Sequence, residues 1–155
     1  MSVAGRILAA TRQKGWRIAT AESCTGGLVM ATLTSVAGGS DVLEGGVVTY
    51  SNRMKLNILN ISEETLDVFG AVSEQVALEM AVGVANLTKA DLCLSVTGIA
   101  GPGGSEQKPE GRVCFSLYVA GKTRVETVEF GALGRENVRQ AALNHGLSML
   151  ASGII

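Results

Sequence analysis

Segments with helical and with strand-like hydrophobic patterns alternate along the chain. Apolar residues recur with helical spacing at Val3, Ile7 and Leu8, and Gly15 ends this pattern before the β-rich segment 16–23. Further helices are predicted over 24–38, 52–60, 73–90 and 135–151, and further strands over 44–51, 91–98, 112–120 and 123–130. The last two strands read as a hairpin. The alternation predicts an α/β fold, a three-layer α/β/α sandwich with a mixed, mostly parallel sheet that contains an antiparallel hairpin.

The size and charge of the chain limit the classes of partner. With 155 residues, 46% of them hydrophobic, the chain can bury one substantial core but not two, so we expect a single domain over residues 1–155. The formal net charge is −1, which provides no basic surface to neutralise nucleic-acid phosphates. We therefore expect a small-molecule partner and no nucleic acid.

Cysteine and histidine usage bears on the cellular compartment and on metal binding. Cys24, Cys93 and Cys114 form no CxxC pair, which is typical of free thiols in a reducing compartment. The chain has one histidine, too few ligands for a metal site, so we expect no metal. No apolar run reaches the about 20 residues that a membrane helix needs, and the N-terminal segment is typical of an amphipathic helix rather than a signal peptide. We expect a cytoplasmic protein without a membrane partner.

The stretch TAESCTGG, residues 20–27, lies where a predicted strand meets a predicted helix. Open α/β sheets bind ligands at this position, and the N–H groups of Thr25, Gly26 and Gly27 are expected to point into the crevice. Ser23 is either a nucleophile at this turn or the N-cap of the following helix. Cys24 is interpreted as a small core residue, because the single histidine, His145, lies on the last helix.

A second segment, GGVVTYSNRMK, brings a tyrosine and a lysine to the same edge of the predicted sheet. Its strand ends near Tyr50, and Lys55 follows about one turn into the next helix. A lysine can act as a base when burial lowers its pKa toward neutrality. The alternative is that Lys55 is a solvated surface residue and Tyr50 an ordinary strand residue.

The glycine-rich segment 98–111 is either a phosphate- or ribose-binding loop or a simple turn. It contains neither GxxxxGK[ST] nor a well-placed GxGxxG, so ATP or dinucleotide binding has no motif support, and no cofactor is expected.

Five blocks of sequence together resemble a known family. AESCTGG, GGVVTYSN..K, GAVSE, TGIAGPGGS..KP.G and GR..VR occur in this order over nearly the whole chain, and they are similar to the CinA C-terminal domain family, the nicotinamide-nucleotide amidohydrolases. The resemblance implies an α/β/α domain that converts nicotinamide mononucleotide to nicotinate mononucleotide and ammonia without a metal. The chain looks like the stand-alone form of the domain, and we expect a homo-oligomer.

The resemblance further implies roles for individual residues. Ser23 is the expected nucleophile, Lys55 its base, and Tyr50 relays or orients the proton. Arg135, Arg139 and the glycine-rich loop are candidates for binding the 5′-phosphate, unless they form only an exposed helix start and a turn. The expected substrate-binding residues are Thr25, Gly26, Gly27, Thr97, Gly98, Ile99, Ala100, Gly101, Ser105, Arg135 and Arg139. Glu22 either orients Lys55 or ends a strand.

Two positions depart from the family pattern. Arg53 places a cation two residues before Lys55, which is expected to lower the lysine pKa further, and Glu110 stands where an apolar residue is usual. The alternative function is a catalytically silent nucleotide-binding or interaction domain linked to competence or DNA-damage responses. The combination of Ser23, Tyr50 and Lys55 favours the amidohydrolase.

Overall fold

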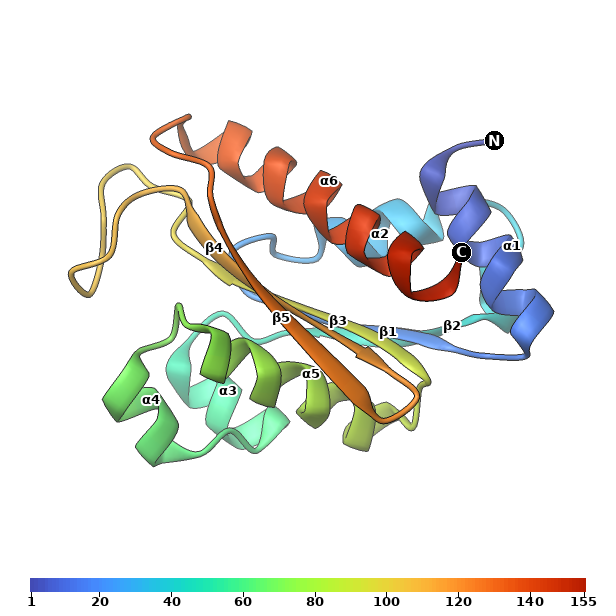
Figure 1. Ribbon diagram of the computed structural model, residues 1–155, viewed down its shortest axis with the longest axis horizontal. Coiled ribbons are helices and arrows are strands. Elements are labelled where there is room, and N and C mark those ends of the chain that lie inside the picture. The colour runs from blue at the N-terminus through green and yellow to red at the C-terminus, as the bar shows by residue number, and fades with distance from the viewer.

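A computed structural model describes residues 1–155 and contains one five-stranded sheet of order β2-β1-β3-β4-β5 (Figure 1). Strand β1 pairs in parallel with both β2 and β3, whereas β4 pairs antiparallel with β3 and with β5. The strands are β1 (Ile18–Glu22), β2 (Leu43–Val48), β3 (Leu92–Gly98), β4 (Arg112–Val119) and β5 (Lys122–Glu129). The predicted mixed sheet with a C-terminal hairpin is confirmed.

Helices cover both faces of the sheet (Figure 1). One face carries α1 (Val3–Lys14), α2 (Leu28–Thr34) and α6 (Arg135–Ile154), and the other carries α3 (Asn52–Leu59), α4 (Glu63–Phe69) and α5 (Glu74–Thr88). A short 3₁₀ turn, η1 (Gly39–Asp41), precedes β2. This is the three-layer α/β/α arrangement that the alternating sequence pattern predicts.

Each helical layer packs its own apolar core against the sheet. Side chains such as Ile7, Leu33 and Leu150 fill the core on the α6 side, and Leu59 and Met80 belong to the core on the α5 side. Because both faces of the central strands are covered, all five residues of β1 are buried, including the polar residues Thr20 and Glu22.

The structure corrects the predicted element boundaries at two places. Helix α2 begins at Leu28 rather than near Cys24, and its N-cap is Gly27, so Ser23 is not a helix cap. The reason is local, since Gly26 and Gly27 adopt φ of 59° and 104° and keep the chain out of the helix until Leu28. Helix α4 was not predicted, although Ser62 caps its N-terminus and Gly70 follows its end.

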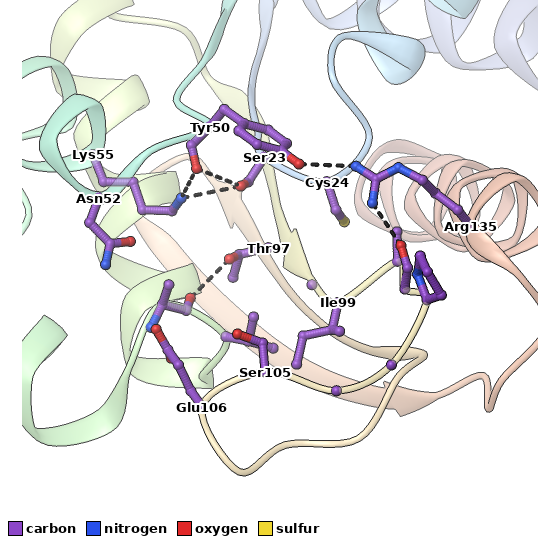
Figure 2. A pocket seen from close by; sticks show the side chains of 18 residues that line it. Ser23, Cys24, Tyr50, Asn52, Lys55, Thr97, Ile99, Ser105, Glu106 and Arg135 are labelled. Atoms are coloured by element: carbon purple, nitrogen blue, oxygen red, sulfur yellow. Dashed lines mark hydrogen bonds between the residues drawn. The ribbon is translucent and has the colours of Figure 1, made fainter.

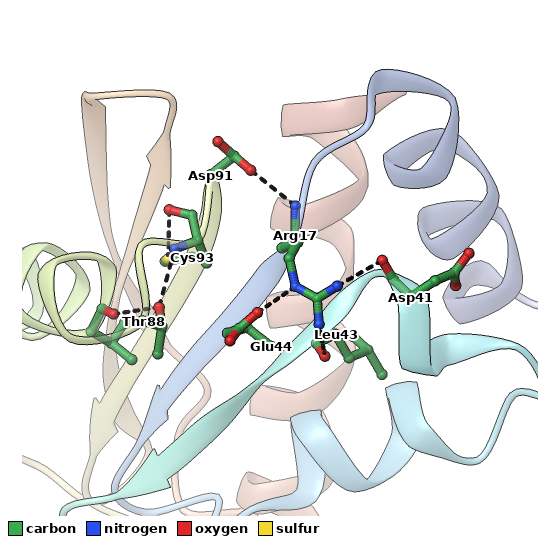
Figure 3. Close-up of polar contacts among 9 residues, drawn as sticks. Arg17, Asp41, Leu43, Glu44, Thr88, Asp91 and Cys93 are labelled. Atoms are coloured by element: carbon green, nitrogen blue, oxygen red, sulfur yellow. Dashed lines mark hydrogen bonds and ion pairs between the residues drawn. The ribbon is translucent and has the colours of Figure 1, made fainter.

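The two ends of the parallel strands differ in character. At the amino ends, Arg17 pairs with Glu44 and donates to the carbonyls of Asp41 and Leu43 at 2.9 and 3.0 Å (Figure 3). The carboxylate of Asp91 accepts the Arg17 backbone N–H at 3.0 Å, which ties the start of β3 to β1. At the carboxyl ends, loops diverge and leave a cavity.

Candidate active site

A cavity of about 320 Å³ opens at the carboxyl ends of β1, β2 and β3 and is lined by 18 residues (Figure 2). Ten of its residues were predicted from the sequence, namely Ser23, Tyr50, Lys55, Thr97, Gly98, Ile99, Ala100, Gly101, Ser105 and Arg135. The predicted residues Thr25, Gly26, Gly27 and Arg139 do not line it. The size lies within the range of about 300–1,000 Å³ typical of small-molecule sites.

Lys55 enters this cavity from the first turn of α3. The hydroxyl of Ser51 caps that helix by accepting the Met54 N–H at 3.1 Å, which fixes the helix start after β2. The Lys55 side chain is almost fully buried, at 1% exposure. Its Nζ lies 3.1 Å from Ser23 Oγ, 2.9 Å from the Thr49 carbonyl oxygen and 3.1 Å from the Tyr50 carbonyl oxygen.

Burial lowers the pKa of Lys55 from 10.5 to about 8, because the ammonium loses its hydration. Coulombic interactions with Cys24 and with Glu106 act in the opposite direction and raise this pKa. The exposed Arg53 is not among the causes, so the expectation that Arg53 lowers this pKa is wrong. Burial alone brings a substantial fraction of Lys55 to the neutral form near physiological pH.

The three partners of Lys55 determine where a neutral amine directs its lone pair. Two of them, the carbonyl oxygens of Thr49 and Tyr50, can only accept hydrogen bonds. A neutral lysine has two N–H bonds, which match these two carbonyls. Its lone pair is then left to face Ser23, the one partner with a hydroxyl proton to donate. The arrangement suits proton transfer from Ser23 to Lys55.

Ser23 follows directly after β1 and is 7% exposed. Its backbone N–H donates to Val96 of β3, which anchors the residue to the sheet. In the turn that follows, the N–H groups of Gly26 and Gly27 donate to the Ser23 carbonyl and to the Glu22 carboxylate. Those two N–H groups therefore do not point into the crevice as expected.

Tyr50 contributes its backbone rather than its phenol to the lysine. Its carbonyl accepts from Lys55, while the residue as a whole is 61% exposed and its hydroxyl accepts a hydrogen bond from Arg135 at 3.0 Å (Figure 2). The phenol hydroxyl is thus hydrogen-bonded to Arg135 and not to Ser23 Oγ. Arg135, the first residue of α6, also donates to the Gly101 carbonyl at 2.8 Å and so links Tyr50 to the glycine-rich loop.

The glycine-rich loop is fastened across the cavity to the segment between α4 and α5. Lys108 donates to the carbonyls of Phe69 and Val72, both at 2.6 Å, and Glu106 accepts the Ala71 N–H at 3.2 Å. Glu110, the second departure from the family pattern, accepts the Gly103 N–H at 2.6 Å and so shapes the loop itself.

Eight cavity residues were not named individually as site residues, namely Cys24, Asn52, Ala71, Val72, Pro102, Gly103, Gly104 and Glu106. The last four of these lie in the glycine-rich segment 98–111, which was considered as a whole as a binding loop or a turn. Ala71 and Val72 belong to the block GAVSE, residues 70–74, which resembles the family. That resemblance could have indicated a place in the site, but no role was assigned to the block. Gly103 and Gly104 lie between Gly101 and Ser105, two residues that were predicted to bind the substrate.

The thiol of Cys24 faces the cavity beside Ser23 (Figure 2). Burial raises its pKa to about 12, so the thiol is not ionised at neutral pH and is a poor nucleophile. His145 contacts Glu126 at 2.7 Å and the ring of Phe115, and it makes no contact with Cys24. Among His, Cys, Asp and Glu side chains, no group of three or more is placed to hold a metal ion, and no helix is long and apolar enough to span a membrane.

Comparisons with known proteins agree on one family. The sequence profile of the CinA C-terminal domain matches residues 1–154. A "CinA-like protein" of Syntrophobacter fumaroxidans is 49% identical over 140 residues, which are 90% of this chain and 33% of that protein. The "Nicotinamide-nucleotide amidohydrolase PncC" of Enterobacter agglomerans is 52% identical over 141 residues, 88% of this chain and 85% of the relative.

Solved structures place the fold in the same group. The competence/damage inducible protein CihA from Agrobacterium tumefaciens superposes with a TM-score of 0.93 at 42% identity, covering 97% of this chain and 92% of that chain. The chain spans about a third of the length of the CinA-like relative and most of the length of the amidohydrolase. The chain belongs to the CinA C-terminal domain family.

Proposed function

We propose that this domain hydrolyses the carboxamide of nicotinamide mononucleotide to nicotinate mononucleotide and ammonia, with Ser23 as nucleophile and Lys55 as base. The observation that carries the proposal is the 3.1 Å contact between Ser23 Oγ and a buried lysine whose pKa is about 8. Burial of a lysine amine lowers stability, and a catalytic role accounts for its retention beside the Ser23 hydroxyl. The name of the Enterobacter relative supports the choice of substrate.

The reaction begins with acylation of Ser23. Neutral Lys55 accepts the hydroxyl proton as Oγ attacks the carboxamide carbon, and the carbonyl π electrons move to the oxygen to form an oxyanion. The tetrahedral intermediate collapses when the C–N bond breaks and the lysine ammonium gives its proton to the departing nitrogen, which leaves as ammonia. Lys55 returns to the neutral form.

Deacylation reverses the same proton transfers with water as the nucleophile. Lys55 accepts a proton from water as it attacks the acyl carbon, and the protonated lysine returns that proton to Ser23 Oγ as the ester bond breaks. The balance is one amide and one water consumed, with one carboxylic acid and one ammonia formed. No cofactor enters any step.

The phosphate of the substrate fits the end of the cavity near Arg135. This guanidinium stands at the N-terminus of the 20-residue helix α6, whose first N–H groups and dipole favour an anion. Arg135 is exposed, and its two hydrogen-bond acceptors, the Tyr50 hydroxyl and the Gly101 carbonyl, are both uncharged. Binding of a phosphate would replace neutral acceptors by a charged one, which forms stronger hydrogen bonds.

The test is ammonia release from nicotinamide mononucleotide by the parent protein, by Ser23→Ala and by Cys24→Ala. We expect Ser23→Ala to lose at least about 1,000-fold in kcat, because removal of a nucleophile removes the acylation step. Cys24→Ala is the matched control, since it truncates the adjacent side chain and should keep most of the activity. Folding is checked by circular dichroism in each case.

Two outcomes would contradict the proposal. Activity that survives in Ser23→Ala and disappears in Cys24→Ala would assign the nucleophile to the thiol. A folded parent that binds the nucleotide and releases no ammonia would favour the alternative, a silent nucleotide-binding domain.

A further inference from the structure

Three charged residues line the cavity, and one of them is an acid. Lys55 and Arg135 are the two cations, and Glu106 is the one carboxylate among the 18 lining residues. Lys55 enters from α3, Arg135 from the start of α6, and Glu106 from the glycine-rich loop (Figure 2). Proton transfer and phosphate binding use the two cations and leave Glu106 without a role.

Glu106 occupies a turn whose backbone conformation is unfavourable for a glutamate. The N–H and the carbonyl of Ser105 bond to the carbonyl and the N–H of Lys108, at 3.0 and 2.8 Å. The two residues between them, Glu106 and Gln107, have φ of 51° and 64°, as in a type I′ turn. Asparagine, aspartate and glycine are the usual residues at these positions, since longer side chains are strained there. Such strain concentrates at functional sites, which favours a role for the Glu106 side chain.

The carboxylate of Glu106 is fixed at one oxygen and unpaired at the other. Its Oε2 accepts the Ala71 N–H at 3.2 Å, across the cavity from Ser23 (Figure 2). Its Oε1 has no protein donor, and the residue is exposed, so this oxygen is accessible to a ligand. Coulombic interaction with Glu106 raises the pKa of Lys55, so the field of the carboxylate reaches the proposed base.

The neighbouring carboxylates are bound to backbone donors and do not line the cavity. Glu22, 1% exposed, accepts three N–H groups around the start of α2 at 3.2, 3.0 and 3.1 Å. It forms no hydrogen bond with Lys55, so the expectation that it orients the lysine is wrong. Glu110 accepts the Gly103 N–H within the loop. A cationic ligand in the cavity therefore has Glu106 as its acidic partner.

The proposed substrate carries charges of both signs. Its nicotinamide ring is an N-substituted pyridinium with a positive charge, and its phosphate is negative. With the carboxamide at Ser23 and the phosphate near Arg135, the ring lies in the cavity that Glu106 lines. Because the other two charged lining residues are cations, an anion is needed there to offset their repulsion of the ring.

We propose that Glu106 is a specificity-determining residue that selects ligands with a cationic pyridinium ring over those with a neutral ring. The inference rests on the proposed function and deepens it, because it defines the charge of the ring that the site accepts. The substrate class is then a pyridinium carboxamide with an anionic group at its far end. A dihydropyridine carboxamide of the same shape lacks the charge that Glu106 recognises.

The experiment compares two ligands that differ in ring charge. Oxidised nicotinamide mononucleotide has a pyridinium ring, and its reduced dihydro form has a neutral ring with the same carboxamide, ribose and phosphate. Titration calorimetry measures the binding of both to Ser23→Ala, which cannot consume them, with and without Glu106→Gln. The glutamine keeps an oxygen for the Ala71 N–H and removes the charge. We expect Glu106→Gln to weaken binding of the oxidised form about 5- to 10-fold and of the reduced form less than about 2-fold.

Further variants separate charge from loop structure. Glu106→Asp keeps the charge and should retain part of the selectivity, whereas Glu106→Gly relieves the positive φ and should lose it as Glu106→Gln does. Glu110→Gln is the matched control, since it neutralises a carboxylate of the same loop that does not line the cavity, and it should keep the selectivity. Because Glu106 is exposed, the selectivity should also shrink in about 0.5 M salt.

The outcomes distinguish this inference from the proposed reaction. Equal weakening of both ligands by Glu106→Gln would show that the residue only holds the loop at Ala71 and would overturn the inference. Failure of Ser23→Ala to bind either ligand would overturn it as well. Selective binding that depends on Glu106, in a parent that releases no ammonia, contradicts the proposed reaction and leaves the inference standing. Ammonia release together with unchanged selectivity in Glu106→Gln has the opposite meaning.

Discussion

At Lys55, burial is the largest influence on the charge of the amine. Burial disfavours the charged form, while the carbonyls of Thr49 and Tyr50 and the hydroxyl of Ser23 all accept from it. Burial lowers the pKa of Lys55 to about 8 in the folded state, from the ordinary lysine value of 10.5. The folded protein therefore binds this proton less tightly than the unfolded chain does.

The first prediction at this scale concerns stability against pH. Below about pH 8 Lys55 is protonated in both the folded and the unfolded state, and the buried charge destabilises the folded state in full. Between about pH 8 and 10.5 the unfolded chain binds more protons than the folded protein does. The free energy of unfolding therefore rises with pH in this range. Relative to Lys55→Met, the parent should gain about 2–3 kcal/mol in free energy of unfolding between pH 7 and 10. Urea unfolding at several pH values measures this.

The control is Lys122→Met, which removes an exposed lysine of the β4–β5 hairpin and should track the parent across the same range. A parent and a Lys55→Met variant that change in parallel with pH would show that the lysine has an ordinary proton affinity.

A second residue-scale prediction concerns the rate. Because the neutral amine is the active base, kcat/KM of the parent should rise with pH and level off above about pH 8. Lys55→Arg keeps a charge but has no accessible neutral form, so it should lose at least about 1,000-fold in kcat. Near-parent turnover by Lys55→Arg would instead make Lys55 a binding residue.

At the scale of elements, the position of α3 depends on its close contact with α5. A Cβ at Gly83 of α5 would lie 2.3 Å from the carbonyl oxygen of Leu59, the last residue of α3. The contact is with backbone, which cannot rotate away. Gly83 thus lets the helix that carries Lys55 approach α5.

We therefore predict that Gly83→Ala displaces α3 and affects both stability and rate. The free energy of unfolding should fall by about 1–3 kcal/mol, the usual cost of overpacking, and kcat by up to about 100-fold, because misplacing a catalytic group by about 1 Å has effects of that size. Thermal unfolding and the ammonia assay measure the two effects.

Gly146→Ala is the matched control, since it is also a helical glycine. Its Cβ would meet side-chain atoms alone, the end of Leu94 at 2.8 Å, which can rotate, and Val29 at an ordinary contact distance of 3.8 Å. The gain in helix propensity of about 1 kcal/mol offsets that contact. If both alanine variants behave alike, the position of α3 does not depend on the missing side chain at Gly83.

The order of elements was predictable because hydrophobic period and glycine breaks are local properties of the sequence. The same is true of the positions of Ser23, directly after β1, and of Lys55, in the first turn of the helix that follows β2, because the two strands end at one edge of the sheet. The contacts of Glu22 with the Gly27 N–H and of Arg139 with the Cys24 carbonyl were not predictable, since they depend on how the turn after Ser23 folds. The orientation of the Tyr50 phenol likewise depends on Arg135, which is remote in sequence.

At the scale of the whole molecule, the candidate site joins the two helical layers. Lys55 comes from the layer of α3, α4 and α5, Arg135 comes from the layer of α1, α2 and α6, and Ser23 lies on the sheet between them (Figure 1). Each layer has its own apolar core. A ligand that contacts all three residues therefore adds a connection between the two layers to the hydrogen bond that Arg135 already makes to Tyr50.

This arrangement predicts that ligand binding stabilises both layers together. Nicotinamide mononucleotide at about 100 times its Kd should raise the free energy of unfolding of Ser23→Ala, which cannot consume it, by about 2.7 kcal/mol. Amide hydrogen exchange should slow at 50–55 and at 135–139, on opposite sides of the sheet. Segment 39–44, at the far edge around Arg17, is the internal control. Protection confined to one layer would contradict a ligand that spans both.

The two chain ends lie close together, at the end of the molecule away from the glycine-rich loop (Figure 1). Helix α1 packs against α6, so Met1 and Ile155 leave the same side of the domain. A reporter protein or purification tag joined to either end is directed away from the mouth of the cavity. The domain is thus suited to immobilisation through its termini, with the cavity left facing the solution.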